Sequence, residues 1–244
     1  MRFAMRSGSA DDGGVAASDI AAVYPAGRRF LDTRPSYHHC RRNSAMTCPR
    51  CGFGYVESSA SDRRLHRRIH AETMHGLRSL RFKSCQCAGR SGERSVIVIN
   101  NESLFIHRQL AQRVSLIGAG DSQLSNVAYA AREARDERNV HLFIGIEADR
   151  ARAYVCLERR FRVWKCTWDE YDAGIFHEAH QQMWSIGFAW VSRAHRRKGW
   201  IRRIVAAADD LLGFGNYFGW YTPFTQDGEA TARAMCPSGI FIAK

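Results

Sequence analysis

The hydrophobic period changes along Trp190-Val191-Ser192-Arg193-Ala194-His195-Arg196-Arg197-Lys198-Gly199-Trp200-Ile201. The residues 186–192 are mostly apolar and suit a buried strand. From Ile201 to Leu212, apolar side chains recur every three or four residues, which predicts an amphipathic helix. The basic turn between them contains Gly199, and its N–H groups and the helix dipole together favour an anion such as pyrophosphate. Basic turns before helices are also common on ordinary solvated surfaces, so the spacing alone leaves both interpretations open.

Strand and helix patterns alternate along the rest of the C-terminal part. Short β-branched or apolar runs predict further strands at 96–99, 141–146, 153–158, 218–221 and 240–242. Helical periods predict helices at 104–117 and 227–236. We therefore expect residues 96–244 to form an α/β (α+β) domain with a mixed sheet flanked by helices.

Four zinc-ligand side chains lie upstream of this domain. Their order is Cys-x2-Cys, a 14-residue interval and His-x3-His, formed by Cys48, Cys51, His66 and His70. Zn²⁺ prefers four such ligands in a tetrahedron, and two histidines four residues apart share one face of a helix. The spacing predicts a small C2H2-type zinc finger over residues 44–80, holding a structural Zn²⁺.

The remaining segments show little periodicity. Residues 1–43 are rich in Gly, Ala, Ser and Arg and predict a disordered basic tail, while 81–95 predict a linker. No apolar run is long enough to span a bilayer, and Met1 to Ala10 lack the apolar centre of a signal peptide. The sequence thus predicts a soluble, intracellular protein with no membrane partner.

Positive charge is concentrated in the N-terminal part. The formal net charge is +12, of which +9 falls on residues 1–95 and +3 on the remainder. The predicted finger helix carries Arg63, Arg64, Arg67 and Arg68, which suit contact with phosphates of DNA or chromatin. Only four of the 36 basic residues are lysine, and so strong an arginine bias is also typical of genome base composition. The purpose of the basic surface stays open.

Taken in order, these motifs resemble the sister-chromatid cohesion N-acetyltransferases of the ESCO family. Those proteins join one finger of this kind to a C-terminal GNAT acetyltransferase domain, and the basic turn before Gly199 resembles the GNAT acetyl-CoA loop. The segments that carry the resemblance are Cys48–Tyr55, His66 and His70, His75-Gly76, Ala151–Glu158, Gly187–Ile204, Thr222–Gly228 and Cys236–Ile242.

The resemblance implies a protein-lysine N-acetyltransferase in which the lysine amine attacks the thioester of acetyl-CoA directly. Its substrate would be a chromatin-associated, cohesin-type protein in the nucleus, and its role would be in sister chromatid cohesion. The implied cofactor-binding residues are Trp190, Val191, Arg196, Arg197, Lys198, Gly199, Trp200, Ile201 and Thr225. Trp190 and Val191 would offer backbone groups to the pantetheine and the acetyl carbonyl.

The family's catalytic positions correspond to Gly187, Thr222, Pro223 and Asp227. The chain departs from the family at three functional positions. Gly187 stands where the family usually has serine, Pro223 where it often has aspartate, and Ile201 where it has alanine. Glu158, Asp172, Asp227 or a chain of waters are the candidates for removing the proton of the amine.

These departures support an alternative. The GNAT-like domain would have lost turnover, and the chain would act through its finger as a DNA- or protein-binding module.

Overall fold

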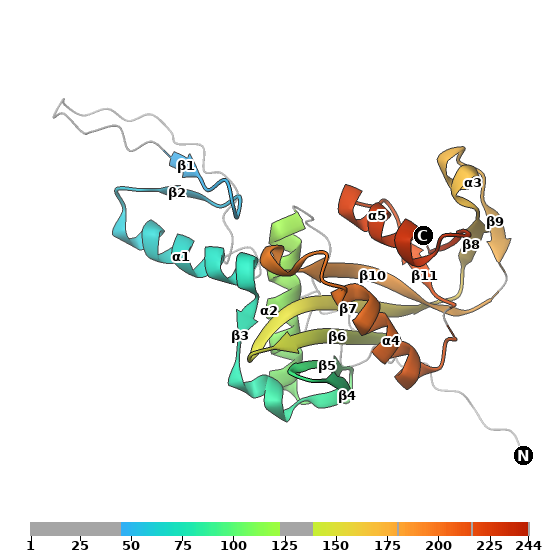
Figure 1. Cartoon of the computed structure of the whole chain (residues 1–244), viewed down its shortest axis with the longest axis horizontal. Helices are drawn as coiled ribbons and strands as arrows, with labels where there is room; N and C mark the ends of the chain where they lie inside the picture. Colours follow the sequence, from blue (N-terminus) through green and yellow to red (C-terminus); the bar gives the residue numbers. More distant parts are fainter. Residues whose placement is uncertain (1–44, 123–138, 180, 216, 244) are drawn as a thin grey trace, which may run out of the picture. The chain divides into compact units, whose positions relative to one another are not determined.

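The computed structural model describes residues 45–122, 139–179, 181–215 and 217–243 (Figure 1). Residues 43–244 form one compact unit, so the finger and the C-terminal domain are not separated by a gap in packing. The tail expected at 1–43 lies outside the described residues. Of the helices in the described ranges, none combines the length and the apolar character that a membrane crossing needs.

A twisted mixed sheet forms the centre of the described C-terminal part (Figure 1). Its strands follow the order β4-β5-β6-β7-β10-β11-β12-β8-β9, and β3 pairs with β7. The contacts of β11 with β10 and with β12 are parallel, and the other pairs are antiparallel. The bounds are β3 Leu77–Arg78, β4 Gln86–Ser91, β5 Arg94–Ile99, β6 Val140–Glu147, β7 Arg150–Arg160, β8 Val163–Cys166, β9 His177–Ala179, β10 Met183–Val191, β11 Gly219–Tyr221 and β12 Ile240–Ala243.

Helices cover both faces of this sheet, as Figure 1 shows for α2 and α4. The helix α2 (Phe105–Ser122) packs on one face and α4 (Trp200–Leu212) on the other. The core between the sheet and α4 is called here the α4-side core, and the core between the sheet and α2 is called the α2-side core. In the run 96–99 of β5, Val96 and Val98 lie in the α4-side core, and the two isoleucines between and after them lie in the α2-side core. Both faces of this strand are therefore apolar. The helices α3 (Trp168–Asp172) and α5 (Gln226–Met235) lie beside the C-terminal strands.

The finger consists of a short hairpin and one helix. The strands β1 (Ala45–Thr47) and β2 (Gly54–Val56) are antiparallel, and α1 spans Ala60–His75. Ser59 caps α1, its side chain accepting a hydrogen bond from the N–H of Asp62. This ββα arrangement places the two cysteines at the hairpin turn and both histidines on the helix.

Most of the expected elements are confirmed, but the linker expected at 81–95 is wrong. The 3-10 helix η2 (Leu80–Ser84) and the strand β4 occupy most of that segment. Phe82 is only 3% exposed and anchors η2 in the α2-side core. The strand β4 is a polar edge strand, largely exposed, so its hydrophobic pattern was too weak to distinguish it from a loop. The sequence pattern also did not predict the elements β8, α3 and β9.

Candidate active site and metal centre

The four predicted zinc ligands converge. The candidate ligand atoms of Cys48, Cys51, His66 and His70 all lie within 4.8 Å of one another, and both cysteines are buried. The Sγ atom of Cys48 lies 3.5 Å from Nδ1 of His70. The Nε2 atom of His66 is buried and has no hydrogen-bond partner among the described residues, which suits a nitrogen that binds a metal. Two thiols and two imidazoles at these separations fit a tetrahedral Zn²⁺.

The knuckle also favours a thiolate. The pKa of Cys48 is lowered to about 6: burial raises it, but the N–H groups of Cys51 and Arg50 donate to the sulfur and outweigh that effect. Zn²⁺ binds cysteine as the thiolate, so this environment lowers the cost of deprotonation on metal binding.

The candidate active site begins where β10 and β11 part. These parallel strands pair at only two positions, Ser185 with Gly219 and Ile186 with Trp220. On its other side, β10 continues to pair with β7 as far as Val191. The β11-facing edge of residues 187–191 is therefore not paired with β11. Such an edge offers backbone N–H and C=O groups to an extended ligand lying between two diverging strands.

A β-bulge lies at the start of this opening. The register of β10 against β7 shifts between Ile186 and Phe188, and Gly187 is the extra residue. Consequently Ile186 packs in the α4-side core, whereas Phe188 packs in the α2-side core. A Cβ atom at position 187 would lie 3.0 Å from Oε1 of Glu158 on β7. Gly187, which stands where the ESCO family usually has serine, thus leaves room for the carboxylate of Glu158.

Glu158 is held in place from two sides. Tyr221 donates its hydroxyl to Oε2 of Glu158 at 3.1 Å, and Arg160 forms an ion pair with the same oxygen at 2.5 Å. The side chain is 28% exposed, so solvent reaches it without surrounding it. Of the three carboxylates considered from the sequence, this one lies beside the bulge. Asp172 instead pairs with Arg233, and Asp227 pairs with Arg196.

The turn that is predicted to bind an anion lies between β10 and the start of α4. Gly199 caps α4 in the left-handed conformation (φ +75°), and no side chain caps the first turn of the helix. Arg197 is also left-handed, with φ +60°. The first-turn N–H groups of α4 therefore lack a side-chain acceptor and suit a phosphate. Lys198 and Gly199 also line a cleft of about 450 Å³ between α4 and the hairpin of β4 and β5, together with Arg90, Arg94, Arg202 and Arg203.

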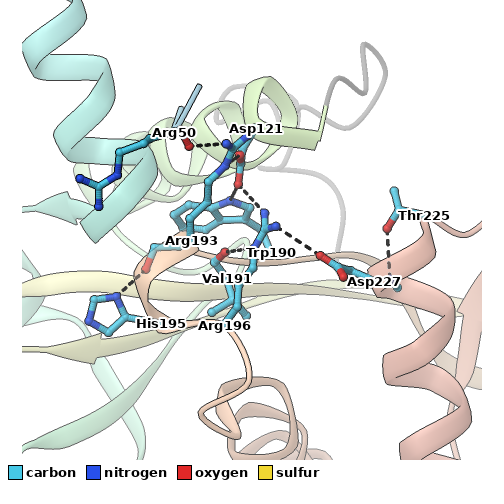
Figure 2. A network of polar contacts seen from close by, with 11 residues as sticks. Arg50, Asp121, Trp190, Val191, Arg193, His195, Arg196, Thr225 and Asp227 are labelled. Atoms are coloured by element: carbon cyan, nitrogen blue, oxygen red, sulfur yellow. Dashed lines mark hydrogen bonds and ion pairs between the residues drawn. The ribbon is translucent and has the colours of Figure 1, made fainter. Parts of the chain in front are cut away.

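Arg196 differs from its predicted role. Its guanidinium does not point to an open phosphate site but forms ion pairs with Asp121 at 2.8 Å and with Asp227 at 3.2 Å, and its Nε donates to the carbonyl oxygen of Val191 (Figure 2). This arginine thus connects the open edge of β10 with the start of α5.

The other predicted residues occupy varied environments. Trp190 is buried against α2, and its indole N–H donates to Asp121 at 2.9 Å. Trp200 is a core residue, so only its backbone N–H faces the turn. Thr225 caps α5 by accepting from the N–H of Gly228. Thr222 and Pro223 directly follow β11, and Ile201 packs at the margin of the core.

Sequence reasoning missed the residues that organise this site through tertiary contacts. Asp121 is on α2, Arg193 is on the 3-10 helix η4 (Arg193–His195), and Tyr221 ends β11. Asp121 has a fully buried side chain and accepts from three partners. No local pattern marks it, because a single aspartate near a helix end is usually solvated.

Comparison with known proteins gives a family match for the finger. Residues 40–72 match the family model described as the zinc-finger of acetyl-transferase ESCO. The finger is of the ESCO type. A comparison with curated protein sequences gives no match.

Two solved structures share the fold of the C-terminal domain of this chain. The xEco2 acetyltransferase domain bound to a K105-CoA conjugate superposes with a TM-score of 0.52 at 12% identity, over 65% of this chain and 98% of that one. The xEco2 acetyltransferase domain alone gives 0.50 at 13% identity, over 65% and 95%. At this identity the likeness concerns the fold. The chain thus combines an ESCO-like zinc finger with a GNAT-like fold.

Proposed function

We propose that this chain is a protein-lysine N-acetyltransferase that uses acetyl-CoA. The observation that carries the proposal is the opening of β10 from β11 with Glu158 at its origin and the uncapped turn of α4 at its far end. Unpaired backbone groups, a carboxylate and a phosphate-binding turn are the three parts that direct acetyl transfer needs. The shared fold with the xEco2 acetyltransferase domain supports this proposal.

In the proposed reaction, the lysine amine attacks the carbonyl carbon of the thioester and a C–N bond forms. Backbone N–H groups along the open edge of β10 stabilise the developing oxyanion. The C–S bond then breaks, and the CoA thiolate leaves. The proton released by the amine passes to Glu158, directly or through one water. Tyr221 and Arg160 position this carboxylate, so it takes the role expected of the family serine and aspartate that are absent here.

We further propose that the protein substrate is a chromatin-associated, cohesin-type protein, and that the enzyme acts in the nucleus in sister chromatid cohesion. The ESCO-type finger supports this assignment. Acetyl-CoA would be held by the edge of Trp190 and Val191 and by the turn that contains Arg197, Lys198 and Gly199. Zn²⁺ would be held by the four finger ligands.

A second candidate function is binding of nucleic acid by the finger. The arginines 63, 64, 67 and 68 of α1 are all exposed, and none forms an ion pair with a carboxylate in the described part of the chain. Their charge suits phosphate contacts, whose affinity falls steeply with salt. DNA binding that is absent, or that is independent of salt, would exclude this function.

Calorimetry with acetyl-CoA, followed by rate measurements on a lysine-containing peptide, tests the enzyme proposal. We expect the wild type to bind and turn over. The Glu158→Gln variant should bind acetyl-CoA normally but react about 10²- to 10⁴-fold more slowly. Glu93→Gln, which removes an exposed carboxylate in the turn between β4 and β5, is the matched control and should react at the wild-type rate. Absence of acetyl-CoA binding would refute the enzyme proposal, and a full rate in Glu158→Gln would refute the role of Glu158.

A further inference from the structure

A single arginine joins the zinc knuckle to the candidate active site (Figure 2). Arg193 donates from Nη1 to the carbonyl oxygen of Arg50, which lies in the knuckle between Cys48 and Cys51. From Nε it donates to Oδ1 of Asp121 at 2.6 Å. The guanidinium of Arg193 thus contacts both the finger and the C-terminal domain.

Asp121 occupies a site prepared by close helix packing. A Cβ atom at position 118 would lie 2.9 Å from side-chain atoms of both Phe188 and Trp190, so Gly118 lets α2 approach β10 closely. Asp121 follows three residues later on the same helical face. This position lets it reach the indole N–H of Trp190, on the strand whose open edge forms the candidate acetyl-CoA site.

The buried carboxylate also holds the start of the anion turn. Arg196 donates to Oδ2 of Asp121 at 2.8 Å, next to the contact of Arg193 with Oδ1. Asp121, Asp227 and the two arginines form a charge-balanced group of four, called here the Asp121 network. A buried carboxylate is stable only when its partners stay in place. Any displacement of Arg193 therefore acts on Arg196 through their shared partner.

The turn that follows needs such support. Arg197 has a positive φ, a conformation that is unfavourable for a non-glycine residue and persists only where the surrounding structure holds it. On the finger side, two zinc ligands bracket Arg50, so bound Zn²⁺ fixes the carbonyl that Arg193 uses. Loss of the metal removes that fixed acceptor.

We infer that Arg193 is a positioning residue that couples zinc binding by the finger to the conformation of residues 196–199, so that a zinc-loaded finger strengthens binding of acetyl-CoA. The coupling itself is independent of the reaction. Only the identity of the ligand rests on the proposed function. The ESCO-type finger then supports the cofactor site from outside it, through Arg193 and Asp121.

Hydrogen exchange of the full chain tests the coupling without a cofactor. Removing zinc, by chelation or by Cys51→Ser, should increase exchange of three amides in the wild type, those of Ser192, His195 and Arg203, which donate backbone hydrogen bonds on both sides of the turn. In Arg193→Gln the same amides should exchange faster even with zinc bound, and removing zinc should change them no further. This non-additivity is the signature of a coupled pair, which a purely structural role of the finger would not produce.

Arg233→Gln is the control, since Arg233 is also a partly exposed arginine held by ion pairs, with Asp172 and Glu229, and lies on α5. It should leave the effect of zinc on these three amides unchanged. Full zinc content and a cooperative thermal transition in each zinc-loaded variant would confirm that it is folded. Should Arg193→Gln not fold, Asp121→Asn, which keeps the shape and removes the charge, replaces it with the same expectation. The inference is overturned if zinc removal leaves the exchange of these three amides unchanged, or if it acts equally in the wild type and in the variant.

Calorimetry then separates this inference from the proposed function. If the wild type binds acetyl-CoA, Arg193→Gln should weaken binding about tenfold, with the loss appearing in KM and not in kcat. An unchanged Kd in this variant would overturn the link to the cofactor. If the wild type does not bind acetyl-CoA, the proposed function fails, whereas the hydrogen-exchange result still decides the coupling.

Discussion

Gly76 and Ala151 touch at the junction of the finger with the sheet: a Cβ atom at position 76 would lie 1.7 Å from the carbonyl oxygen of Ala151. Gly76 ends α1 with φ +81°, and the chain then enters β3, whose Leu77 pairs with Ala151 on β7. Arg152 and Arg150 donate to the carbonyl oxygens of His75 and Gly76. The motif His75-Gly76 is thus the place where finger and sheet are joined by backbone.

Substitution of this glycine should destabilise the junction strongly. We expect Gly76→Ala to lower the free energy of unfolding by at least about 3 kcal/mol, because the added carbon meets backbone that cannot move aside. Gly92→Ala is the control, since it has φ +60° but no atom within 4 Å of the added carbon. That variant should lose only about 1–2 kcal/mol from the backbone conformation. Urea unfolding measures both, and equal losses would show that the contact with Ala151 adds nothing.

Two glycines of α2 should respond in opposite directions. Gly118→Ala should cost about 1–3 kcal/mol, because its Cβ would overlap Phe188 and Trp190. Gly120→Ala should stabilise by about 0.5–1 kcal/mol, because it meets nothing within 4 Å and alanine favours the helix. Thermal or urea unfolding gives the two signs. Stabilisation by Gly118→Ala would mean that α2 and β10 are not in close contact.

The zinc finger should unfold separately up to the junction. Cys48→Ser should abolish zinc binding, measured as metal content per chain, and expose residues 48–75 to proteolysis. Residues from Leu77 onward should stay folded and resist proteolysis, with only local loosening of the turn between β10 and α4, because Leu77 is only 2% exposed and belongs to the α2-side core. The exposed Cys87 supplies the control, Cys87→Ser, which should retain zinc. Full zinc content in Cys48→Ser would refute the ligand assignment.

Stability should fall in mild acid because of His195. Burial, followed by the nearby cations of Arg152 and Lys198, lowers the pKa of this imidazole from 6.5 to about 4. Between these two values the unfolded chain binds a proton that the folded chain excludes. The contribution of His195 therefore decreases as the pH falls from about 6.5 to about 4, and changes no further below that range.

The expected loss from His195 is about 2 kcal/mol between pH 7.5 and pH 5. Urea unfolding at both values, in the wild type and in His195→Gln, isolates this contribution from the protonation of the zinc ligands, which both proteins share. A difference between the two pH values that is the same in both proteins would contradict the prediction.

Local patterns predicted the elements whose side chains alternate or repeat strongly. The strand 96–99, the helix that became α4 and the zinc ligand spacing were all evident, because each pattern is complete within one short segment. The segment of the edge strand β4 has the sequence pattern of a linker, because a strand exposed on one side carries polar residues that resemble a loop. The sequence does not indicate the bulge either, because Gly187 changes only the register in which β10 pairs with β7.

The sequence by itself determined the zinc centre and the order of the strongly patterned strands and helices, because these depend on spacing along the chain. Only the tertiary structure decided which charged groups face one another. Asp121 and Arg193 are 72 residues apart, and Glu158 meets Gly187 across two paired strands. Their contacts follow from the close approach of α2 to β10 and from the bulge, and neither leaves a periodic trace in the sequence. For the same reason Arg196, expected to bind phosphate, is instead shared between two carboxylates that sequence spacing could not bring together.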